Sequence, residues 1–437
     1  MRWLLASLIV LIVVADILDI KMSLGPGLSG KNALLYVIAV ALILKLIVQQ
    51  PFVFNLRALH VTFVILILYS LLSVFTAYFV VQYPRYSLVS SGISWKTKLV
   101  DPAMFFLVFF YGLRETRNAH ALLKVLLVAV VIGNAIALSN AVGLTAIGDM
   151  ELRKDGRMTG VMGESNQDAA FVSLFLPALG AAIILSRGLW RTWWFGGLLF
   201  SLGVMALTAS RGGFVAVMVS AVWGMFVFRR YVSPGRLAAI ASGAAAIVIV
   251  VFSVMSIRYG DLLYKRIVGD STSSDMIAAS SGRLEIWSNA LALMSDKPLT
   301  FLSGYGWNVY WSLPTRLSPH NHYLSLWFNV GLVGLVCGTL VLVLVVREAM
   351  AALPYSSPRY SPVLISFAIG TVAIATATFF VDLYAPWLWF WAYAGLVMRI
   401  AVNLRSQAGL KQASEPLSER KALPRKDSYG WVGTVRQ

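Results

Sequence analysis

The stretch YLSLWFNVGLVGLVCGTLVLVLVV, residues 323–346, decides the fold class, because it is an unbroken apolar block without a charged side chain. A block of about 20 such residues crosses the roughly 30 Å hydrocarbon core of a bilayer as an α-helix. Lipid offers no hydrogen-bond partners, so the backbone of the block must satisfy its own polar groups, which a helix does within one segment. Residues 323–346 therefore predict a transmembrane helix.

Similar blocks recur along the whole chain. Of its 437 residues 59% are hydrophobic and only 13% are charged, about half the charged fraction of a soluble domain. The composition predicts an all-α polytopic membrane protein with about twelve transmembrane helices. The first block lacks a small-residue cleavage site and is interpreted as a retained span. The predicted spans are 3–20, 33–49, 61–81, 99–113, 121–142, 169–186, 193–209, 212–228, 237–256, 323–346, 362–381 and 386–402.

The lysines and arginines predict the orientation. Cytoplasmic loops carry an excess of these residues, and a cytoplasmic N-terminus places most of the formal net charge of +17 on the inside. The basicity is thus a topology signal and predicts no nucleic-acid partner. Lys45 and Lys124, near the inner ends of their spans, are interpreted as snorkelling side chains. The predicted organisation is 1–256 with spans one to nine, 257–322 as a large outer loop with an amphipathic helix, 323–402 with spans ten to twelve, and 403–437 as a basic, disordered cytoplasmic tail that contacts anionic membrane lipids.

Several chemistries find no support in the sequence. The single cysteine, Cys337, excludes a disulfide framework and a cysteine-based metal site. No Walker loop, HExxH motif or nucleophile elbow is present. Acidic residues of the spans, among them Asp101 and Asp382, lie near the outer ends, whereas an ion-coupled carrier needs such groups at mid-depth.

A tight outer turn between two predicted spans carries the first candidate site, Ser210-Arg211-Gly212-Gly213. An arginine at this depth is costly unless it is paired or functional. Its planar guanidinium suits a pair of phosphate oxygens, and the two glycines allow backbone and ligand to approach closely. The alternative is a snorkelling arginine in a turn.

The second candidate lies in the outer loop, where residues 281–294 predict a short amphipathic helix with Ile286, Leu291 and Met294 on one side. Arg283 occupies its first turn, where free backbone amides favour an anion. The alternative is an ordinary solvated arginine.

Two further polar segments are predicted on the same outer side of the membrane as these two candidates. Residues 319–324, PHNHYL, open the tenth predicted span with His320 and His322, and histidine exchanges a proton near neutral pH. This i, i+2 pair has no acidic helical partner at metal spacing, so no metal site is predicted. Residues 157–168 are polar and punctuated by glycine, which suits either contact with a sugar or diphosphate or a solvated linker.

Taken in order, these segments resemble the O-antigen ligase and polymerase family of bacterial envelope glycosyltransferases. The ordered set is more specific than any one piece, and it covers about residues 150–350. The matching elements are Arg157-Met158-Thr159-Gly160 with Asn166, Ser210-Arg211-Gly212-Gly213, Gly282-Arg283 with Trp287, and His320-Asn321 with Tyr323-Leu324 and Gly331-Leu332.

The resemblance implies a GT-C-like glycosyltransferase of the bacterial inner membrane, with a periplasmic active site and cytoplasmic termini. The donor would be a glycan on undecaprenyl diphosphate. The acceptor would be a lipid A-core sugar in a ligase or another lipid-linked glycan in a polymerase. No metal, nucleotide sugar or other cofactor is implied. The chain has Glu164-Ser165-Asn166 where the family often has Asn-Pro-Asn, so only Asn166 matches and the role of Glu164 stays open. His322 occupies a position that varies in the family, which favours His320.

Within this resemblance each candidate receives a role. Arg211 and Arg283 stabilise the departing diphosphate, because fixed cations aimed at developing charge are strong catalytic groups, and His320 is the general base. An O-antigen ligase is the first hypothesis and a repeat-unit or exopolysaccharide polymerase the second. A polysaccharide exporter or flippase is disfavoured, since the polar residues crowd one rim. The predicted substrate-binding residues are Arg157, Asn166, Asn321, Tyr323 and Trp287.

Overall fold

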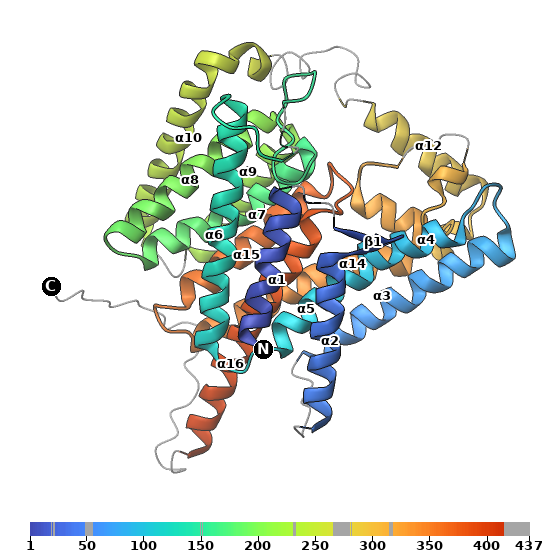
Figure 1. Ribbon diagram of the computed structural model, residues 1–437, viewed down its shortest axis with the longest axis horizontal. Coiled ribbons are helices and arrows are strands. Elements are labelled where there is room, and N and C mark those ends of the chain that lie inside the picture. The colour runs from blue at the N-terminus through green and yellow to red at the C-terminus, as the bar shows by residue number, and fades with distance from the viewer. Residues whose placement is uncertain are drawn as a thin grey trace.

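The computed structural model describes residues 1–437 except 19, 21, 49–55, 149, 151, 230–232, 265–279, 281, 314–317 and 415–437. Helices dominate the described residues (Figure 1), and β1 and β2 form one short antiparallel hairpin with Ser23 opposite Ser29. The elements are α1 (Arg2–Ile17), β1 (Ser23–Gly25), β2 (Leu28–Ser29), α2 (Gly30–Val48), α3 (Arg57–Phe75), η1 (Thr76–Val81), α4 (Leu88–Trp95), η2 (Lys96–Val100), α5 (Asp101–Tyr111), α6 (Thr116–Ala141), α7 (Ser165–Leu185), α8 (Leu189–Thr208), α9 (Arg211–Phe228), α10 (Pro234–Leu263), α12 (Arg283–Asp296), α13 (Thr300–Ser303), η5 (Val309–Ser312), α14 (His322–Ala352), η6 (Leu353–Tyr355), α15 (Ser361–Ala377) and α16 (Pro386–Ser414).

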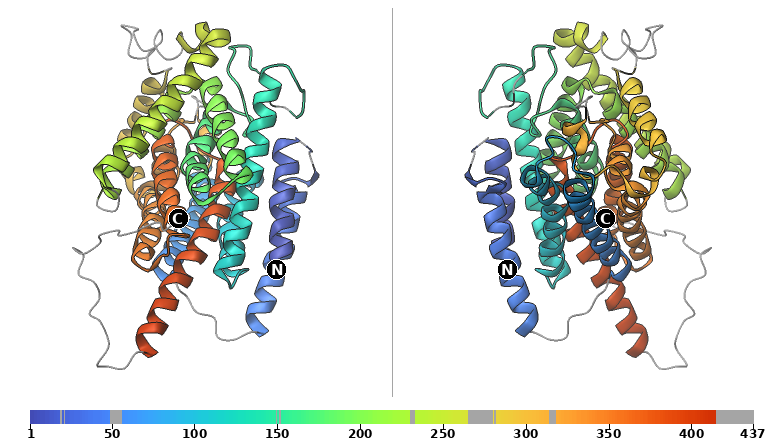
Figure 2. Two further views of the ribbon diagram at one scale, coloured as in Figure 1. Left: turned by 90° about the vertical axis from the view of Figure 1, so that its left-hand side faces the viewer. Right: turned by 90° about the vertical axis from the view of Figure 1, so that its right-hand side faces the viewer.

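The predicted fold class, an all-α polytopic membrane protein, is confirmed. Among the described residues, eight helical segments are long and apolar enough to cross a membrane: α2, α3 with η1, α6, α7, α9, the second half of α10, α14 with η6, and α16. The other four predicted spans coincide with α1, α5, α8 and α15, so every predicted span falls on a helix. The helices lie side by side in a bundle from which the end of α16 projects (Figure 2).

Aromatic side chains fill the centre of the bundle. Phe106 and Phe110 of α5, Phe171 of α7, and Trp389 and Tyr393 of α16 are each fully buried. Their rings meet in stacked and edge-on pairs, such as Phe171 with Trp389 at 5.3 Å between centroids. Such pairs contribute about 1 kcal/mol each beyond the area that they bury. The apolar sequence thus builds both a lipid-facing surface and a packed core.

Two boundaries differ from those predicted. The span predicted at 99–113 belongs to a longer helical segment in which α4 passes through the π-helical turn η2 into α5. Helix α16 continues to Ser414, so the first part of the predicted disordered tail is helical; the rest lies outside the described residues. The extension is held by the Asn403 amide on the Arg114 carbonyl at 2.7 Å and by an Arg405–Glu348 ion pair at 2.6 Å.

The amphipathic helix predicted in the outer loop is confirmed as α12, but its buried side differs. Ala290 and Met294 are buried, whereas Leu291 is 39% exposed. The apolar positions Ile286, Ala290 and Met294 are spaced by four residues and share one face, from which Leu291 is turned away. Trp287 joins that face as a half-buried side chain.

Gly331 breaks α14 at a place where the preceding residues bind the segment after α13. Its φ is +72°, and a Cβ there would lie 2.0 Å from a backbone carbonyl oxygen, so only glycine fits. The carbonyls of Phe328 and Asn329, just before the break, accept the amides of Tyr305 (2.7 Å) and Gly306 (3.0 Å). The break therefore fixes the segment after α13 against the beginning of α14.

Candidate active site

The turn between α8 and α9 is as tight as predicted and ends in a capped helix. Ala209 takes a left-handed conformation with φ +45°, which ends α8. Ser210 caps α9, since its hydroxyl accepts the Gly213 amide at 3.4 Å. Arg211 is consequently the first residue of α9, where backbone amides favour an anion.

The two glycines that follow Arg211 serve helix packing, which corrects the prediction that they make room for a ligand. A Cβ at Gly212 would lie 2.5 Å from the Phe380 side chain, and one at Gly213 would lie 2.7 Å from Ala169. Protein side chains already occupy the space beside both glycines. Their absent Cβ atoms let α9 approach α7 and the segment between α15 and α16.

Asn166, at the start of α7, joins two of the predicted motifs. Its Oδ1 accepts hydrogen bonds from Arg157 Nη2 at 2.9 Å and from the Ser210 hydroxyl at 3.0 Å, and its Nδ2 donates to Glu164 at 3.2 Å. Arg157 is only 8% exposed, and its Nε donates to the Thr208 carbonyl at 2.8 Å. In this structure Arg157 and Asn166 therefore brace the turn before Arg211, while their predicted contact with substrate stays a prediction.

A second polar cluster surrounds Asp382, in the segment between α15 and α16. One carboxylate oxygen lies 3.2 Å from Nδ1 of His322. The other accepts the hydroxyls of Ser318 at 3.3 Å and Ser325 at 3.1 Å. The role of His322 is not evident from the sequence; the structure pairs it with a carboxylate 60 positions further along the chain.

Asp382 is held as an anion. Burial by itself raises the pKa of the carboxyl, but the hydrogen bond from His322, the positive charge of Lys98 and the bond from Ser325 outweigh burial and lower the pKa to about 2. The side chain is 17% exposed. Lys98 comes from the π-helical turn η2, so this turn contributes to the electrostatics of the site.

Gln167 connects the two clusters. Its side-chain amide donates to the Asp382 carbonyl at 2.9 Å and accepts the Tyr384 amide at 3.2 Å. Burial raises the pKa of Tyr384, and the negative charges of Glu164 and Asp382 raise it further, which places that phenol near both clusters. Since Asn166 and Gln167 are adjacent, one turn of α7 positions the arginine-bearing turn and the histidine–aspartate pair together.

Asn321 and Tyr323 support the beginning of α14. The Asn321 side chain caps this helix by accepting the Leu324 amide at 3.1 Å, and it is buried. The Tyr323 hydroxyl donates to the Ala375 carbonyl at 2.8 Å. Both polar groups are thus engaged within the protein, and a role for either in substrate binding stays a prediction.

His320 projects from a strained turn just before that cap. It is exposed, and its φ of +50° is left-handed, which is uncommon for a residue with a side chain. Trp287 of α12 holds this turn, since its indole Nε1 donates to the Pro319 carbonyl at 2.7 Å. Backbone strain of this kind persists where the surroundings enforce it and occurs often at functional sites.

Arg283 is the first residue of α12, directly after Gly282 in a left-handed conformation with φ +74°. It is half-buried and lies four residues before Trp287, so both side chains occupy one face of the helix. The Trp287 contact turns that face towards the His320 segment.

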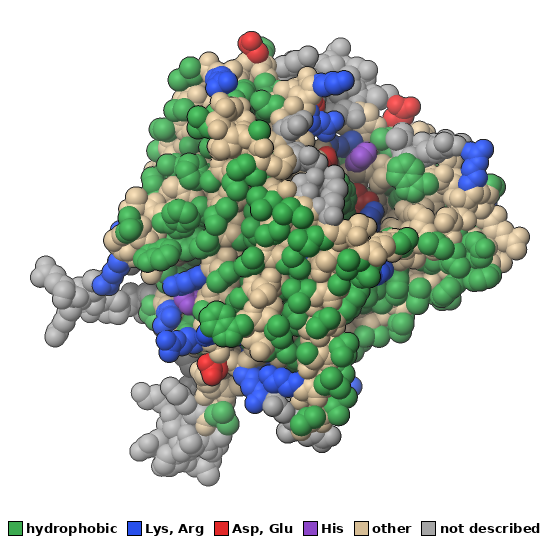
Figure 3. Space-filling view, in the orientation of Figure 1, with side chains coloured by type: hydrophobic (Ala, Val, Ile, Leu, Met, Phe, Trp, Pro, Cys, Tyr) green, Lys and Arg blue, Asp and Glu red, His purple; other side chains and the backbone are tan. Residues whose placement is uncertain are grey.

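Charged side chains gather in a hollow of the surface at this end of the bundle. Figure 3 shows lysine or arginine, aspartate or glutamate, and histidine side chains inside a recess between the part around α10 and the part around α12. Within the described part of the chain, no three His, Cys, Asp or Glu side chains are grouped so as to hold a metal ion.

Sequence reasoning missed Asp382 and Gln167 as members of the site. Asp382 was visible only as an acidic residue near the outer end of a span, and Gln167 had no signal beyond its neighbour Asn166. Both act through partners more than 50 positions away, which sequence spacing does not reveal.

The fold and the site together define a polytopic membrane protein with a recess at one end of its helix bundle that holds basic, acidic and histidine side chains. Residues 196–338, about a third of the chain, match the family model described as O-antigen ligase, which supports the predicted resemblance to the O-antigen ligase and polymerase family. The matched segment includes Arg211, Arg283 and His320, while Asn166 and Asp382 lie outside it. Comparison with curated proteins gives no match. The family supports glycosyltransferase-like activity of the ligase or polymerase type on lipid-linked glycans.

Proposed function

We propose that the protein is an O-antigen ligase, which transfers a glycan from undecaprenyl diphosphate to a sugar hydroxyl of lipid A-core at the periplasmic face of the inner membrane. One observation carries the proposal: hydrogen bonds join signature segments far apart in the sequence at one end of the bundle. Asn166 links Arg157 to Ser210, and Trp287 links α12 to the His320 turn. A donor and an acceptor that are both lipid-borne would meet at such a rim.

The arginines are proposed to bind the leaving group. In the reaction an acceptor hydroxyl attacks the anomeric carbon of the donor glycan, and the bond from that carbon to the diphosphate oxygen breaks. Negative charge grows on the diphosphate, so fixed cations lower the barrier. Arg211 begins α9 and Arg283 begins α12, so each arginine lies at the positive end of a helix dipole, which also favours an anion.

His320 is proposed as the general base that takes the proton of the acceptor hydroxyl. It is exposed at the rim, and the bond from Trp287 and the buried cap Asn321 fix the turn on either side of it. A base must come within hydrogen-bond reach of the proton that it removes, and an exposed ring on a fixed turn meets that requirement.

A specific observation favours His322 as the alternative base. Its Nδ1 contacts the Asp382 carboxylate, the arrangement by which a carboxylate orients a catalytic histidine. If Nδ1 donates to Asp382, Nε2 is the basic nitrogen. Separate His320→Ala and His322→Ala variants distinguish the two assignments: the base variant loses transfer at every pH, whereas the other keeps measurable turnover.

A repeat-unit polymerase uses the same chemistry with another acceptor, so an experiment in cells is needed to distinguish a ligase from a polymerase. We expect a strain that lacks this gene to lose all long-chain surface lipopolysaccharide while lipid-linked polymer accumulates. Gel analysis of the lipopolysaccharide tests this. A single repeat unit still attached to core in the deletion strain would identify a polymerase and refute the ligase. Transfer by the purified protein in detergent, where transport is impossible, would exclude the exporter hypothesis.

A further inference from the structure

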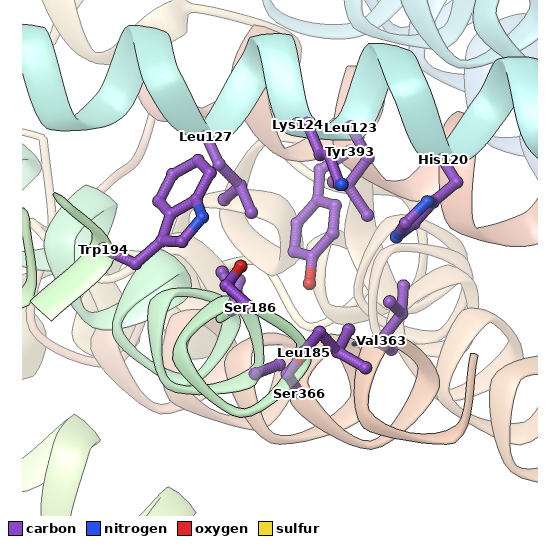
Figure 4. Close-up of a pocket in the computed structure, with 13 residues that line it drawn as sticks. His120, Leu123, Lys124, Leu127, Leu185, Ser186, Trp194, Val363, Ser366 and Tyr393 are labelled. Atoms are coloured by element: carbon purple, nitrogen blue, oxygen red, sulfur yellow. Dashed lines mark hydrogen bonds between the residues drawn. The ribbon is translucent and has the colours of Figure 1, made fainter. Parts of the chain in front are cut away.

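A second cavity lies at the opposite end of the bundle. It is lined by α6, α7, α8, α15 and α16, where α7 ends and α8 begins, whereas the candidate active site lies where α7 begins and α8 ends. Its volume is about 30 Å³, room for about two water molecules. The side chains that line it include His120, Lys124, Ser186, Trp194 and Tyr393 (Figure 4).

Tyr393 contributes a buried hydroxyl group to the cavity. Its side chain is fully buried, and its hydroxyl makes no hydrogen bond of good geometry among the described residues, although the Ser366 side chain, which also lines the cavity, lies near it. Figure 4 shows the hydroxyl directed into the cavity, towards Ser186 and Leu185. Leaving such a group unsatisfied costs about 1–3 kcal/mol, so an acceptor bound in the cavity would relieve this cost.

The surroundings of the cavity are cationic. Lys124 lines it, and both Lys124 and Arg359 lie close enough to His120 to interact with it electrostatically. Arg187 lies in the turn between α7 and α8, and Arg191 lies in the first turn of α8, at the same end. No aspartate or glutamate belongs to the described lining. The charge therefore complements an anion.

The remaining lining is apolar, which favours an anion that carries an apolar part. Leucine, alanine, valine and tryptophan side chains of four helices form most of the wall: Leu123, Leu127, Ala178, Ala181, Ala182, Leu185, Val363 and Trp194. A free phosphate gains nothing from such a wall, whereas the glycerol and first acyl carbons of a phospholipid do. Basic pockets between transmembrane helices are a common place for lipid head groups.

We propose that this cavity binds the phosphate head group of an anionic phospholipid from the leaflet at this end of the bundle. Lys124 and Arg359 pair with the phosphate, and the Tyr393 hydroxyl donates to one of its oxygens. The cavity admits part of a head group, so the acyl chains lie outside it along the bundle. Snorkelling still accounts for Lys45, which the described lining does not include. The inference is independent of the proposed transfer reaction.

Native mass spectrometry of the delipidated full-length protein in detergent tests the proposal, with dioleoylphosphatidylglycerol and dioleoylphosphatidylcholine as probes. We expect at least one retained phosphatidylglycerol at concentrations where phosphatidylcholine is lost. Lys124→Gln should weaken its retention about five-fold, the effect of one basic side chain near a membrane surface. Tyr393→Phe should weaken it by a similar factor through one lost hydrogen bond. Lys45→Gln, at the same predicted depth on α2, is the matched control and should change nothing.

Three results would overturn the proposal: equal retention of the two lipids, equal effects of the Lys124 and Lys45 variants, or displacement of the lipid by millimolar inorganic phosphate, which would identify a free-anion site. Folding is checked by thermal unfolding without added lipid. There Tyr393→Phe should be at least as stable as the wild type, because it deletes an unpartnered hydroxyl. A variant that is equally stable but retains wild-type lipid would also contradict the assignment of Tyr393.

Discussion

Replacing Asp382 by asparagine keeps the shape of the side chain but removes its charge from the junction of α14 with the segment between α15 and α16. The carboxylate contacts His322 at 3.2 Å and accepts the hydroxyls of Ser318 and Ser325. These bonds and the charge of Lys98 outweigh burial and lower the pKa from 3.8 to about 2. At about 1.4 kcal/mol per pKa unit, the folded protein favours the charged form by roughly 2 kcal/mol.

This pKa fixes the direction of the pH dependence. Because the folded pKa lies below the unfolded value of 3.8, the stabilisation is fully present above that value and is lost as the pH falls towards about 2. We expect Asp382→Asn to be less stable than the wild type by roughly 2 kcal/mol at pH 7. The difference should shrink as the pH falls from 5 to 3, since the unfolded wild type then takes up a proton that the folded carboxylate, with its lower pKa, still resists.

Unfolding of the purified proteins in detergent at pH 7, 5, 4 and 3 measures both quantities. Asp296→Asn, at the exposed end of α12, is the control and should shift stability little at any of these values. Equal stability of Asp382→Asn and the wild type at pH 7 would refute the reasoning. So would a difference that persists unchanged at pH 3, because it would then come from packing rather than charge.

Further variants test the site and its supports. Arg211→Lys should lose most transfer activity in a purified assay while keeping its fold, because a point charge does not replace a bidentate guanidinium; wild-type turnover would count against diphosphate recognition. Gly331→Ala should lower the thermal stability by about 2 kcal/mol, since its Cβ would lie 2.0 Å from a carbonyl oxygen, whereas Gly180→Ala, with open space beside it, should not. Trp287→Phe removes the indole donor to Pro319 and should reduce kcat several-fold with little change in KM; an unchanged kcat would show that this bond does not position the His320 turn.

Much of the architecture was predictable because membrane helices can be recognised from their apolar composition and length. Every predicted span falls on a helix, and α12, predicted at 281–294, begins and ends within two residues of those limits, at Arg283 and Asp296. The π-helical turn before α5 was not predictable, because nothing local distinguishes Lys96–Val100 from an ordinary helical turn. The end of α16 was not predicted, because its polar sequence suits a disordered tail equally well. The structure adds an ion pair between Arg405 and Glu348 of α14, which the sequence does not reveal.

The site was predictable in its motifs but not in its connections. Arg211, Arg283 and His320 stand out by type and place in the sequence, and so does Arg157, but the burial of Arg157 has no signal in the sequence. The partnership of His322 with Asp382 depends on the packing of α14 against α15 and α16, which no local pattern encodes. Tertiary packing thus decides which polar residues brace the rim and which face the recess.

The measurement that tests the central claim most directly is glycan transfer by purified protein in detergent, from an undecaprenyl diphosphate-linked glycan to lipid A-core or to a second lipid-linked glycan. We expect transfer to lipid A-core by the wild type, and none by His320→Ala although that variant inserts and folds. Full activity of His320→Ala would contradict its role as the base. Transfer by the wild type to the lipid-linked glycan alone would contradict the ligase and identify a polymerase.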